Sequence, residues 1–389
     1  MERVYEGYAR DGGSVGTRNH VAVIPTVGCV NEVARRIAEQ VEGVIPLLHH
    51  QGCCQLSPDI ETITRVLVGL GRNPNVAGVL LINLGCQAVN LDRVRAGIEE
   101  STETHAVSLQ ELGGITNTTA RGVELARQMV TKLKNERSKT GLDSLVVGLK
   151  CGASGATSGV ASNPAIGVAV DMLVDEGATV VFGETTEALG AEDVLSKRAA
   201  SPEIARSILS KISEMEERAK SIGVDMRGSQ PTPGNIRAGL TTIEDKSLGA
   251  VIKTGTRTIQ GVLEYGERPQ GKGLYFMDTP GREIEMLTGL AAGGCEVIVF
   301  STGVGAPQGF PIVPVIKVSG NENTCRHLAE HIDIDVSGIV RGEQTLEEAG
   351  QRIFDEIIQV ASGRQVKAER LGYDIWGVNL GIYMKGPVI

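Results

Sequence analysis

Short runs of apolar and β-branched residues alternate along the chain with longer stretches of helical periodicity, and this alternation constrains the fold more than any other feature. Runs that are apolar on both faces are typical of parallel strands, because helices cover both sides of a parallel sheet. We therefore predict an α/β protein with mainly parallel sheets flanked by helices in Rossmann-like layers. Strands are predicted at residues 20–25, 44–49, 77–83, 106–109, 144–149, 179–182, 273–277 and 296–300, and helices at 32–40, 60–70, 118–133 and 164–176.

A polar stretch, KNERSKTGLD at residues 134–143, separates two groups of predicted strands and has no apolar periodicity. The 389 residues also exceed the usual size of one domain. Two domains are therefore predicted, an N-terminal α/β domain at 1–138 and a C-terminal α/β domain at 139–389. The turn-rich stretch 225–239, which contains the string PTPGN, lies between apolar elements and is interpreted as a long functional loop.

The net charge of -9 and the pI near 5.4 argue against a general binder of nucleic acid or anionic membranes, since such proteins present a basic surface. The first residues, MERVYEGYARDGG, lack the apolar core of a signal peptide, and no apolar run approaches the roughly 18 residues that cross a bilayer. These features predict a cytoplasmic protein. Its seven cysteines are an odd count spread along the chain, which indicates reduced thiols and not a disulfide scaffold.

Four cysteines follow predicted strands and stand beside glycines: Cys29, Cys53, Cys86 and Cys151. Ligands bind beyond the carboxyl ends of parallel strands, and thiolates are soft ligands suited to iron, zinc or iron–sulfur clusters. His49 stands close enough in sequence to add an imidazole. Any one cysteine is also explained as a small buried residue. Taken together, however, Cys53, Cys86 and Cys151 predict a metal site.

Charged residues stand at similar positions in the second half of the chain. Glu184 and Glu187 follow the predicted strand 179–182, where a carboxylate can act as a general base or hold a cation, although a helix N-terminus would favour the same charges. Lys253 and Lys317 interrupt apolar runs, so each needs a charged partner, an anionic ligand or solvent.

The glycine-rich strings KCGASGATSG and STGVGAPQG expose backbone N–H groups that could cradle a carboxylate or a phosphate. Neither string matches the P-loop or the dinucleotide-binding fingerprint, which argues against a nicotinamide cofactor.

Several strings, taken in order, are specific enough to indicate a family. They are GYARDGGSVGTRN, IPTVGCVN, HHQGCC, NLGC, KCGASGATSGVASNPAIG, FGETTE, PTPGN, EDKSLGAVIKTGT, STGVGAPQG and PVIKVSG. Essentially the whole chain resembles the altronate and galactarate dehydratases, a family that also includes the large subunits of sulfolactate sulfo-lyases. The resemblance implies the large catalytic subunit of a hydro-lyase that dehydrates a sugar acid to a 2-keto-3-deoxy acid.

The resemblance also implies an iron cofactor, either mononuclear Fe²⁺ or a 4Fe–4S cluster, with Mn²⁺ as a further candidate. Matched position by position, it implies that the metal ligands are Cys53, Cys86, Cys151 and His49. The same matching gives catalytic roles to Glu184, Glu187, His49 and Lys253. Substrate contacts are implied for Arg18, Asn19, Ser154, Asn163, Asn235 and Lys317.

Three positions depart from the family motif: Gly155 stands where the motif has Asp, Val304 where it has Arg, and Ala306 where it has Thr. Arg can hold a carboxylate through two hydrogen bonds and Val cannot, so the substrate could be a smaller or less acidic hydroxy acid. The alternatives are a lyase of the same family that expels sulfite from a sulfonated hydroxy acid, and, outside enzymes, a metal-sensing subunit.

Single-chain relatives carry a small domain of the SAF type before the region that this chain resembles. A separate small SAF-domain subunit is therefore expected as a partner, together with a homo-oligomer of large chains and a small-molecule sugar-acid substrate.

Overall fold

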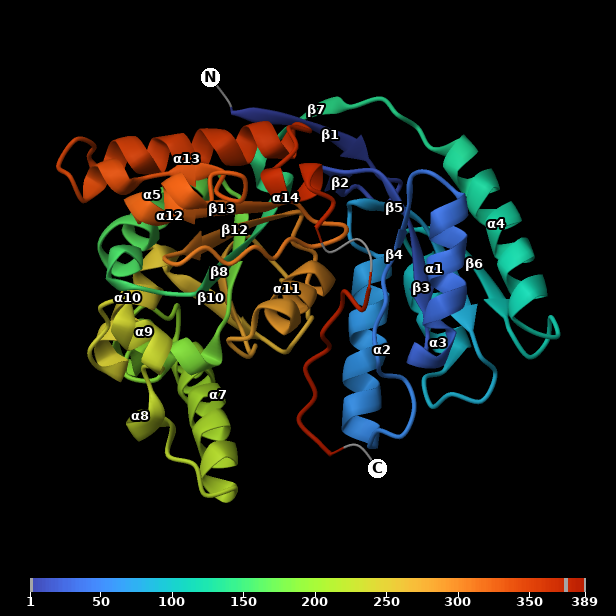
Figure 1. Ribbon diagram of the computed structural model, residues 1–389, viewed down its shortest axis with the longest axis horizontal. Helices are drawn as coiled ribbons and strands as arrows, with labels where there is room; N and C mark the ends of the chain where they lie inside the picture. The colour runs from blue at the N-terminus through green and yellow to red at the C-terminus, as the bar shows by residue number, and fades with distance from the viewer. Residues whose placement is uncertain (1–2, 374–376, 388–389) are drawn as a thin grey trace.

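A four-stranded parallel sheet forms the centre of the N-terminal unit, in the strand order β4-β3-β5-β6. The computed structural model describes residues 3–373 and 377–387 of the chain. The strands are β3 (His20–Pro25), β4 (Val44–Pro46), β5 (Val76–Asn83) and β6 (Glu103–Ser108), and the helices around them are α1 (Asn31–Gln40), α2 (Ser57–Gly71), α3 (Leu91–Glu99) and α4 (Ile115–Lys132). Figure 1 shows α1 and α4 on one side of this sheet and α2 on the other.

Alternate residues of the two central strands, β3 and β5, face the two helical layers. Val23 and Ile82 pack with α1 and α4, whereas Ile24 and Leu81 pack with α2 and α3. Successive side chains of a strand point to opposite faces, so a strand buried on both faces is apolar at every position. This burial explains the uninterrupted apolar runs in the sequence.

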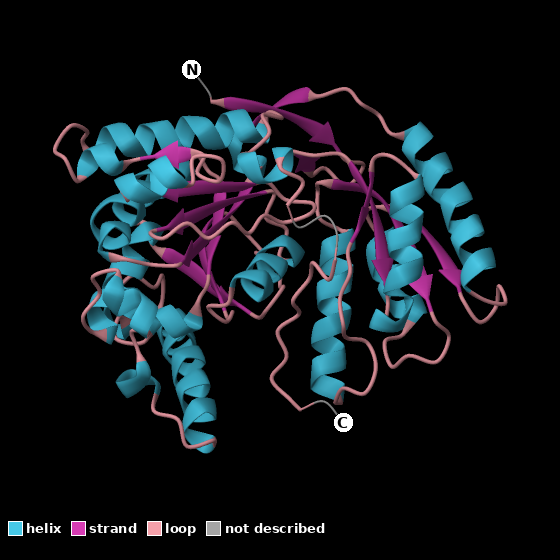
Figure 2. Ribbon diagram, in the orientation of Figure 1, coloured by secondary structure: helices cyan, strands magenta, loops and turns pink. Residues whose placement is uncertain are grey.

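The C-terminal unit contains a seven-stranded sheet in the order β10-β11-β9-β8-β12-β13-β14, and every pair in it is parallel. Its strands are β8 (Val146–Gly152), β9 (Thr179–Phe182), β10 (Ile259–Leu263), β11 (Gly273–Met277), β12 (Val297–Thr302), β13 (Val315–Ser319) and β14 (Ile334–Asp335). The longer helices around the sheet are α5 (Asn163–Asp175), α7 (Pro202–Ser221), α11 (Glu283–Ala292) and α13 (Leu346–Ala361). Figure 2 shows the helices and strands of this unit in separate colours.

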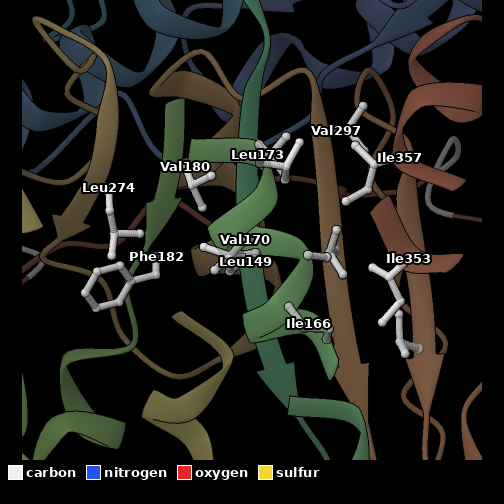
Figure 3. Close-up of a cluster of buried hydrophobic side chains, with 14 of the residues drawn as sticks. Leu149, Ile166, Val170, Leu173, Val180, Phe182, Leu274, Val297, Ile353 and Ile357 are labelled. Atoms are coloured by element: carbon white, nitrogen blue, oxygen red, sulfur yellow. The ribbon is translucent and has the colours of Figure 1, made fainter. Parts of the chain in front are cut away.

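One face of the seven-stranded sheet packs against α5 and α13. Leu149 and Val297 of the sheet meet Val170 of α5 and Ile353 of α13 in an apolar cluster (Figure 3). The opposite face packs against α11 in a second apolar cluster, which continues through α11 into α2 of the N-terminal unit. The two units therefore share a continuous apolar interface.

Shorter elements connect these layers. A small antiparallel sheet has the order β2-β1-β7, with β1 (Val4–Ala9), β2 (Val15–Gly16) and β7 (Ser138–Gly141). The short helices are α6 (Glu192–Lys197), α8 (Met226–Ser229), α9 (Pro233–Arg237), α10 (Ile243–Val251), α12 (Glu322–His327) and α14 (Lys367–Arg370). Within the described residues, no helix combines the length and the apolarity needed to span a bilayer.

The predicted fold class is confirmed, and each predicted strand and helix overlaps an element of the structure. The division at residue 138 stays a prediction, and β7 lies across it. The interpretation of 225–239 as a loop is wrong in part, because this stretch contains α8 and α9. The side chains of Asp225 and Thr232 cap these two helices by accepting backbone N–H groups at their first turns.

Segment 377–387 passes from the C-terminal unit alongside α2 of the N-terminal unit (Figure 1). The Asn379 amide accepts from the Leu48 backbone N–H at 2.8 Å and donates to the Pro46 carbonyl at 2.8 Å. Further along, the backbone N–H of Lys385 donates to the Asp59 carboxylate at 3.0 Å, and the Lys385 ammonium lies 2.6 Å from the Asp278 carboxylate. This segment therefore ties the two units together.

Candidate active site

The carboxyl ends of β8 and β9 bring a lysine, a cysteine and a glutamate together. The register of these parallel strands pairs Leu149 with Phe182, so Lys150 and Cys151 at the end of β8 lie beside Glu184, just after β9. Lys253 approaches from the 3-10 turn η5 (Ile252–Thr254) after α10. The side chains of this group are almost completely buried.

The Glu184 carboxylate lies between two ammonium groups. One of its oxygens is 2.6 Å from Lys150 Nζ, and the other is 2.9 Å from Lys253 Nζ and accepts the Cys151 backbone N–H at 3.1 Å. Burial alone would raise the pKa of Glu184, but the two lysines outweigh burial and hold it below its usual value. Burial alone would lower the pKa of both lysines, but Glu184 holds them above their usual values. All three groups therefore stay charged, and Glu184 is a poor proton acceptor.

The two lysines differ in how many of their ammonium N–H groups are hydrogen-bonded within the protein. Lys150 donates to Glu184, to the Cys151 carbonyl and to the Gly281 carbonyl, so its three donors are occupied. Lys253 donates to Glu184 and, at 3.1 Å, to the Ala250 carbonyl. Among the described residues no acceptor is found for its third N–H group, so Lys253 is the lysine that can still bind a ligand.

Cys151 lies at the centre of a small polar group. Its sulfur is 3.1 Å from the Ser154 hydroxyl and accepts from the Asn163 amide at 3.6 Å. Burial raises the pKa of its thiol, although the charge of Lys253 opposes this. The predicted residues Ser154, Asn163, Glu184 and Lys253 are therefore brought together around Cys151.

Two buried acceptor atoms near Cys151 have no hydrogen-bond partner among the described residues: Asn163 Oδ1 and Glu187 Oε2. The other Glu187 oxygen is 3.1 Å from Lys246 Nζ, and the charge of Glu187 acts on both Cys151 and Lys253. Buried polar atoms are rarely left without a partner in proteins. These two atoms therefore favour a ligand with donor groups or positive charge at this position.

A hollow of about 530 Å³ lies beside this group, lined by Ala153, Ser154, Thr232, Gly234, Asn235, Arg237, Ala238, Val304 and Asn321. Ser154 connects the hollow with Cys151. The Asn235 amide donates to the Ser154 carbonyl at 3.0 Å, so α9 is attached to the loop after β8. Two predicted substrate-binding residues, Ser154 and Asn235, thus line one concave space that could hold a small acid.

The remaining predicted cysteines lie on the N-terminal unit. Cys29, Cys53 and Cys86 are exposed on the loops after β3, β4 and β5. Backbone hydrogen bonds join these loops, because the N–H of Gly28 donates to the Gln51 carbonyl at 2.9 Å and other N–H groups donate to Gly52. The clustering of cysteine loops at one edge of this sheet is therefore as expected, but Cys151 belongs to the other unit.

His49 is buried below these loops, and both of its ring nitrogens are occupied. Nδ1 accepts the Gln51 backbone N–H at 3.2 Å, so Nε2 carries the proton and donates to the Pro25 carbonyl at 2.7 Å. Burial lowers the pKa of His49 to about 4. A neutral imidazole with both nitrogens hydrogen-bonded has no lone pair available for a metal or a substrate.

The predicted ligand set is therefore not assembled. Across residues 3–373 and 377–387, no three side chains of His, Cys, Asp or Glu gather closely enough to hold a metal ion. Cys53 and Cys86 are exposed on one unit, whereas Cys151 is buried in the other. As placed, these residues do not fit an iron site, and iron stays a prediction.

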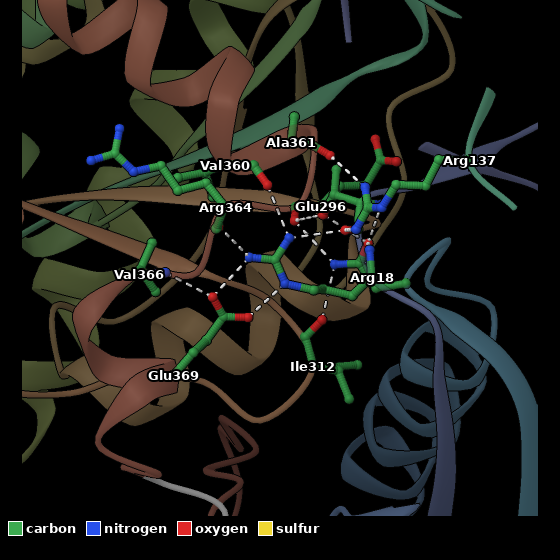
Figure 4. A network of polar contacts seen from close by, with 11 residues as sticks. Arg18, Arg137, Glu296, Ile312, Val360, Ala361, Arg364, Val366 and Glu369 are labelled. Atoms are coloured by element: carbon green, nitrogen blue, oxygen red, sulfur yellow. Dashed lines mark hydrogen bonds and ion pairs between the residues drawn. The ribbon is translucent and has the colours of Figure 1, made fainter. Parts of the chain in front are cut away.

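Arg18, expected to contact substrate, is part of a network between the two units (Figure 4). Nε and Nη2 donate to the Glu369 carboxylate at 2.6 and 2.7 Å, and the other donors bind the carbonyls of Thr17, Val360 and Arg364. All five guanidinium N–H groups are thus used inside the protein. The structure gives Arg18 a connecting role between units.

Asn19 and Lys317 also lie apart from the group around Cys151. The Asn19 amide accepts from Arg10 at 2.8 Å and donates to the Lys134 carbonyl at 3.1 Å. Lys317 is buried on β13, and its ammonium donates to the Pro307 carbonyl at 3.1 Å. Neither residue lines the hollow beside Ser154.

Two residues of the site were missed by the sequence analysis. Lys150 interrupts an apolar run just as Lys253 and Lys317 do, so the same signal would have indicated it. Arg237 carries no comparable signal, because only the folding of α9 against Ser154 brings it to the hollow.

Comparison with known proteins gives consistent results over the whole chain. The family model described as D-galactarate/Altronate dehydratase, C-terminal, matches residues 142–379, and the model described as D-galactarate dehydratase/Altronate hydrolase, second domain, matches residues 7–134. The (2R)-sulfolactate sulfo-lyase subunit beta of Chromohalobacter salexigens is 40% identical over 376 residues, which cover 95% of this chain and 96% of that protein.

Longer relatives match less closely. Altronate dehydratase of Bacillus subtilis is 33% identical, over 95% of this chain and 76% of its own length. Galactarate dehydratase (L-threo-forming) of Escherichia coli is 33% identical, over 99% of this chain and 77% of its own length. The two α/β units, taken with the family models and these relatives, define a lyase. The chain belongs to the galactarate/altronate dehydratase family.

Proposed function

We propose that this protein is the large subunit of a carbon–sulfur lyase that expels sulfite from a short sulfonated 2-hydroxy acid of the sulfolactate type. The observation that carries the proposal is the 40% identity to a sulfo-lyase subunit along nearly the full length of both chains, compared with 32–33% for longer altronate and galactarate dehydratases. Sugar-acid dehydration, the first expectation from the sequence, becomes the second candidate.

Such an elimination removes the proton from C2 of the acid and breaks the C3–S bond. The electron pair of the C2–H bond forms the C2–C3 double bond, and sulfite leaves with the electrons of the C3–S bond. The resulting enol takes up a proton at C3, loses the proton of its hydroxyl group and becomes pyruvate. Negative charge develops on the carboxylate as the C2 proton leaves, so a fixed positive charge near that carboxylate lowers the barrier.

We assign Lys253 to bind the developing charge, because one of its N–H groups has no acceptor among the described residues. Glu184 holds Lys253 and Lys150 in place, and its lowered pKa makes it unsuited to proton removal. Glu187 is the better candidate for the base, because one of its oxygens has no partner in the described part of the chain.

A partner subunit is part of the proposal. The name of the relative from Chromohalobacter salexigens describes it as a subunit, and the matched dehydratases extend beyond the region that this chain covers. We propose a small SAF-domain subunit as the partner. The homo-oligomer of large chains stays a prediction.

The proposal is tested by offering (2R)-sulfolactate, altronate and galactarate to the purified protein, alone and with its small subunit. We expect sulfite and pyruvate in equal amounts from sulfolactate. Formation of a 2-keto-3-deoxy acid from a sugar acid, without sulfite from sulfolactate, would instead establish the dehydratase as the function.

Iron is kept as a separate proposal, and none of the steps above depends on it. If Cys86 is a ligand, Cys86→Ser protein purified without oxygen should lose its iron, while Cys325→Ser, altered at a buried cysteine on α12 of the C-terminal unit, should retain it. Metal analysis by mass spectrometry together with acid-labile sulfide measures both variants. Equal iron in the two variants would remove Cys86 from the ligand set.

A further inference from the structure

The hollow beside Cys151 is formed by loops that approach one another very closely. A Cβ atom on Gly155 would lie 3.0 Å from the Ala238 carbonyl oxygen, and one on Gly303 would lie 2.8 Å from the Gly155 nitrogen. The Ala156 N–H also donates to the Ala238 carbonyl at 2.9 Å. The absence of side chains at these two glycines therefore lets α9 and the loops after β8 and β12 close around one space.

The short helix α9 gives this hollow its charge. Thr232 and Asn235 form a capping box at the start of α9, and Asn235 also binds the Ser154 carbonyl. Arg237 stands at the last position of α9 and is the charged residue among those that line the hollow. No hydrogen bond or ion pair of its guanidinium group is found within the residues that the structure describes.

The wall formed by the loop after β12 is apolar. Val304, which lies there, is 54% exposed although it is a large hydrophobic residue. A space with one unpaired guanidinium, an apolar wall and the hydroxyl of Ser154 suits a small ligand that has one anionic end and a short carbon chain. Ser154 in turn contacts Cys151, so the rest of such a ligand would extend toward Lys253.

We propose that Arg237 determines substrate specificity by binding the anionic group that lies farthest from the reacting C2 atom, which in a sulfonated hydroxy acid is the sulfonate. A guanidinium group can donate two parallel hydrogen bonds to two oxygens of such an anion. The identity of this anion as a sulfonate rests on the proposed function, whereas the binding of a second anionic group by Arg237 does not.

The test compares acids that carry a second anion with matched acids that lack it. Dissociation constants are measured by calorimetry for (2R)-sulfolactate against L-lactate, which has the same spatial arrangement at C2, and for galactarate against D-galactonate, using the protein with its small subunit. We expect the intact protein to prefer a dianionic acid in at least one pair. Arg237→Ala should reduce that preference by about tenfold or more, equivalent to about 1.4 kcal/mol.

Two further variants control for indirect effects. Arg206→Ala, which alters an exposed arginine paired with Glu203 on α7, should leave the preference unchanged. Arg237→Lys should retain part of the preference for a dianionic acid, because lysine keeps the positive charge but lacks the planar pair of N–H donors of a guanidinium group. An unchanged preference in Arg237→Ala, or no preference for a dianion in the intact protein, would overturn the proposal.

The same data separate this inference from the proposed function. A preference that depends on Arg237 for galactarate but not for sulfolactate would support Arg237 as the anion-binding residue and reject the sulfo-lyase. A preference for sulfolactate that is independent of Arg237 would reject the role of Arg237 alone.

Discussion

At the scale of single residues, Glu184 organises the candidate active site. Its backbone is in the left-handed region, with φ of 66°, directly after β9, and its N–H group donates to the Thr279 hydroxyl at 2.7 Å. A non-glycine residue in this conformation costs about 1–3 kcal/mol and persists where the surrounding contacts stabilise it. Here the contacts are the two lysines that share the carboxylate, so the position of Glu184 and the charges of the lysines depend on one another.

Replacing Glu184 with Gln keeps the shape of the side chain but leaves two buried ammonium groups without a counter-ion. We expect the free energy of unfolding to fall by about 3–5 kcal/mol and the activity to be lost. Urea denaturation at pH 7 measures the change. Glu203→Gln, which breaks an exposed ion pair with Arg206, should leave stability almost unchanged. Similar stability of both variants would contradict this account of Glu184.

His49 predicts how stability depends on pH. Its imidazole is buried and neutral in the folded protein, with a pKa of about 4, whereas in the unfolded chain it takes up a proton below about 6.5. Above pH 6.5 the neutral His49 imidazole therefore contributes about 3 kcal/mol to the free energy of unfolding. This contribution is lost as the pH falls from 6.5 to 4. In His49→Leu, the slope of unfolding free energy against pH between 6.5 and 4.5 should be smaller. An unchanged slope would show that His49 does not titrate on unfolding.

At the scale of elements, the contact between α2 and α11 depends on a glycine. A Cβ atom on Gly69 of α2 would lie 2.3 Å from the carbonyl oxygen of Ala292, at the end of α11. A backbone oxygen cannot move away as the end of a flexible side chain can. The two helices must therefore separate if any side chain larger than hydrogen is introduced at this position.

Gly69→Ala should lower the free energy of unfolding by about 1–3 kcal/mol, since overpacking outweighs the helix propensity gained from alanine. Equilibrium denaturation monitored by far-ultraviolet circular dichroism measures this. Gly12→Ala, where the nearest atom to a new Cβ is 3.8 Å away, serves as the control and should stay close to the unaltered protein. A stabilised Gly69→Ala variant would mean that α2 and α11 are less closely packed.

At the scale of the whole molecule, segment 377–387 and the network of Arg18 join the two units at different places. The segment binds both units through Asn379, Lys385 and neighbouring backbone groups. Arg18, which follows β2, binds Glu369 near the other end of the chain. The candidate site lies on one unit and the exposed cysteine loops lie on the other. These connections therefore hold the two groups of residues at a fixed position relative to each other.

Asn379→Ala removes the hydrogen bonds to the backbone of Pro46 and Leu48 and leaves buried polar groups without partners. We expect a loss of about 1–3 kcal/mol in stability and faster hydrogen exchange in 377–387 and around Leu48. Hydrogen exchange followed by mass spectrometry locates the change, and exchange in β8 and β9 should remain as before. Uniformly faster exchange throughout the C-terminal unit would show that the effect is not local.

The sequence by itself determined the fold class, most of the parallel strands and the helices α1, α2, α4 and α5, because burial on two faces leaves uninterrupted apolar runs. Strands with little apolar signal, such as β7, and β13, which Lys317 interrupts, were not found. Cys151, Ser154 and Glu184 were each predicted as site residues in separate roles, and they lie together because they are close in sequence or on neighbouring strands of one sheet.

Only the tertiary structure decided how the two units face each other and which atoms remain available for ligands. Arg18 and His49 stood at promising positions in the sequence, yet their hydrogen-bonding groups are used inside the protein. Cys53 and Cys86 lie on a different unit from Cys151, and Arg237 reaches the hollow because α9 packs against Ser154. Such arrangements depend on contacts between distant parts of the chain, which local patterns of residues do not record.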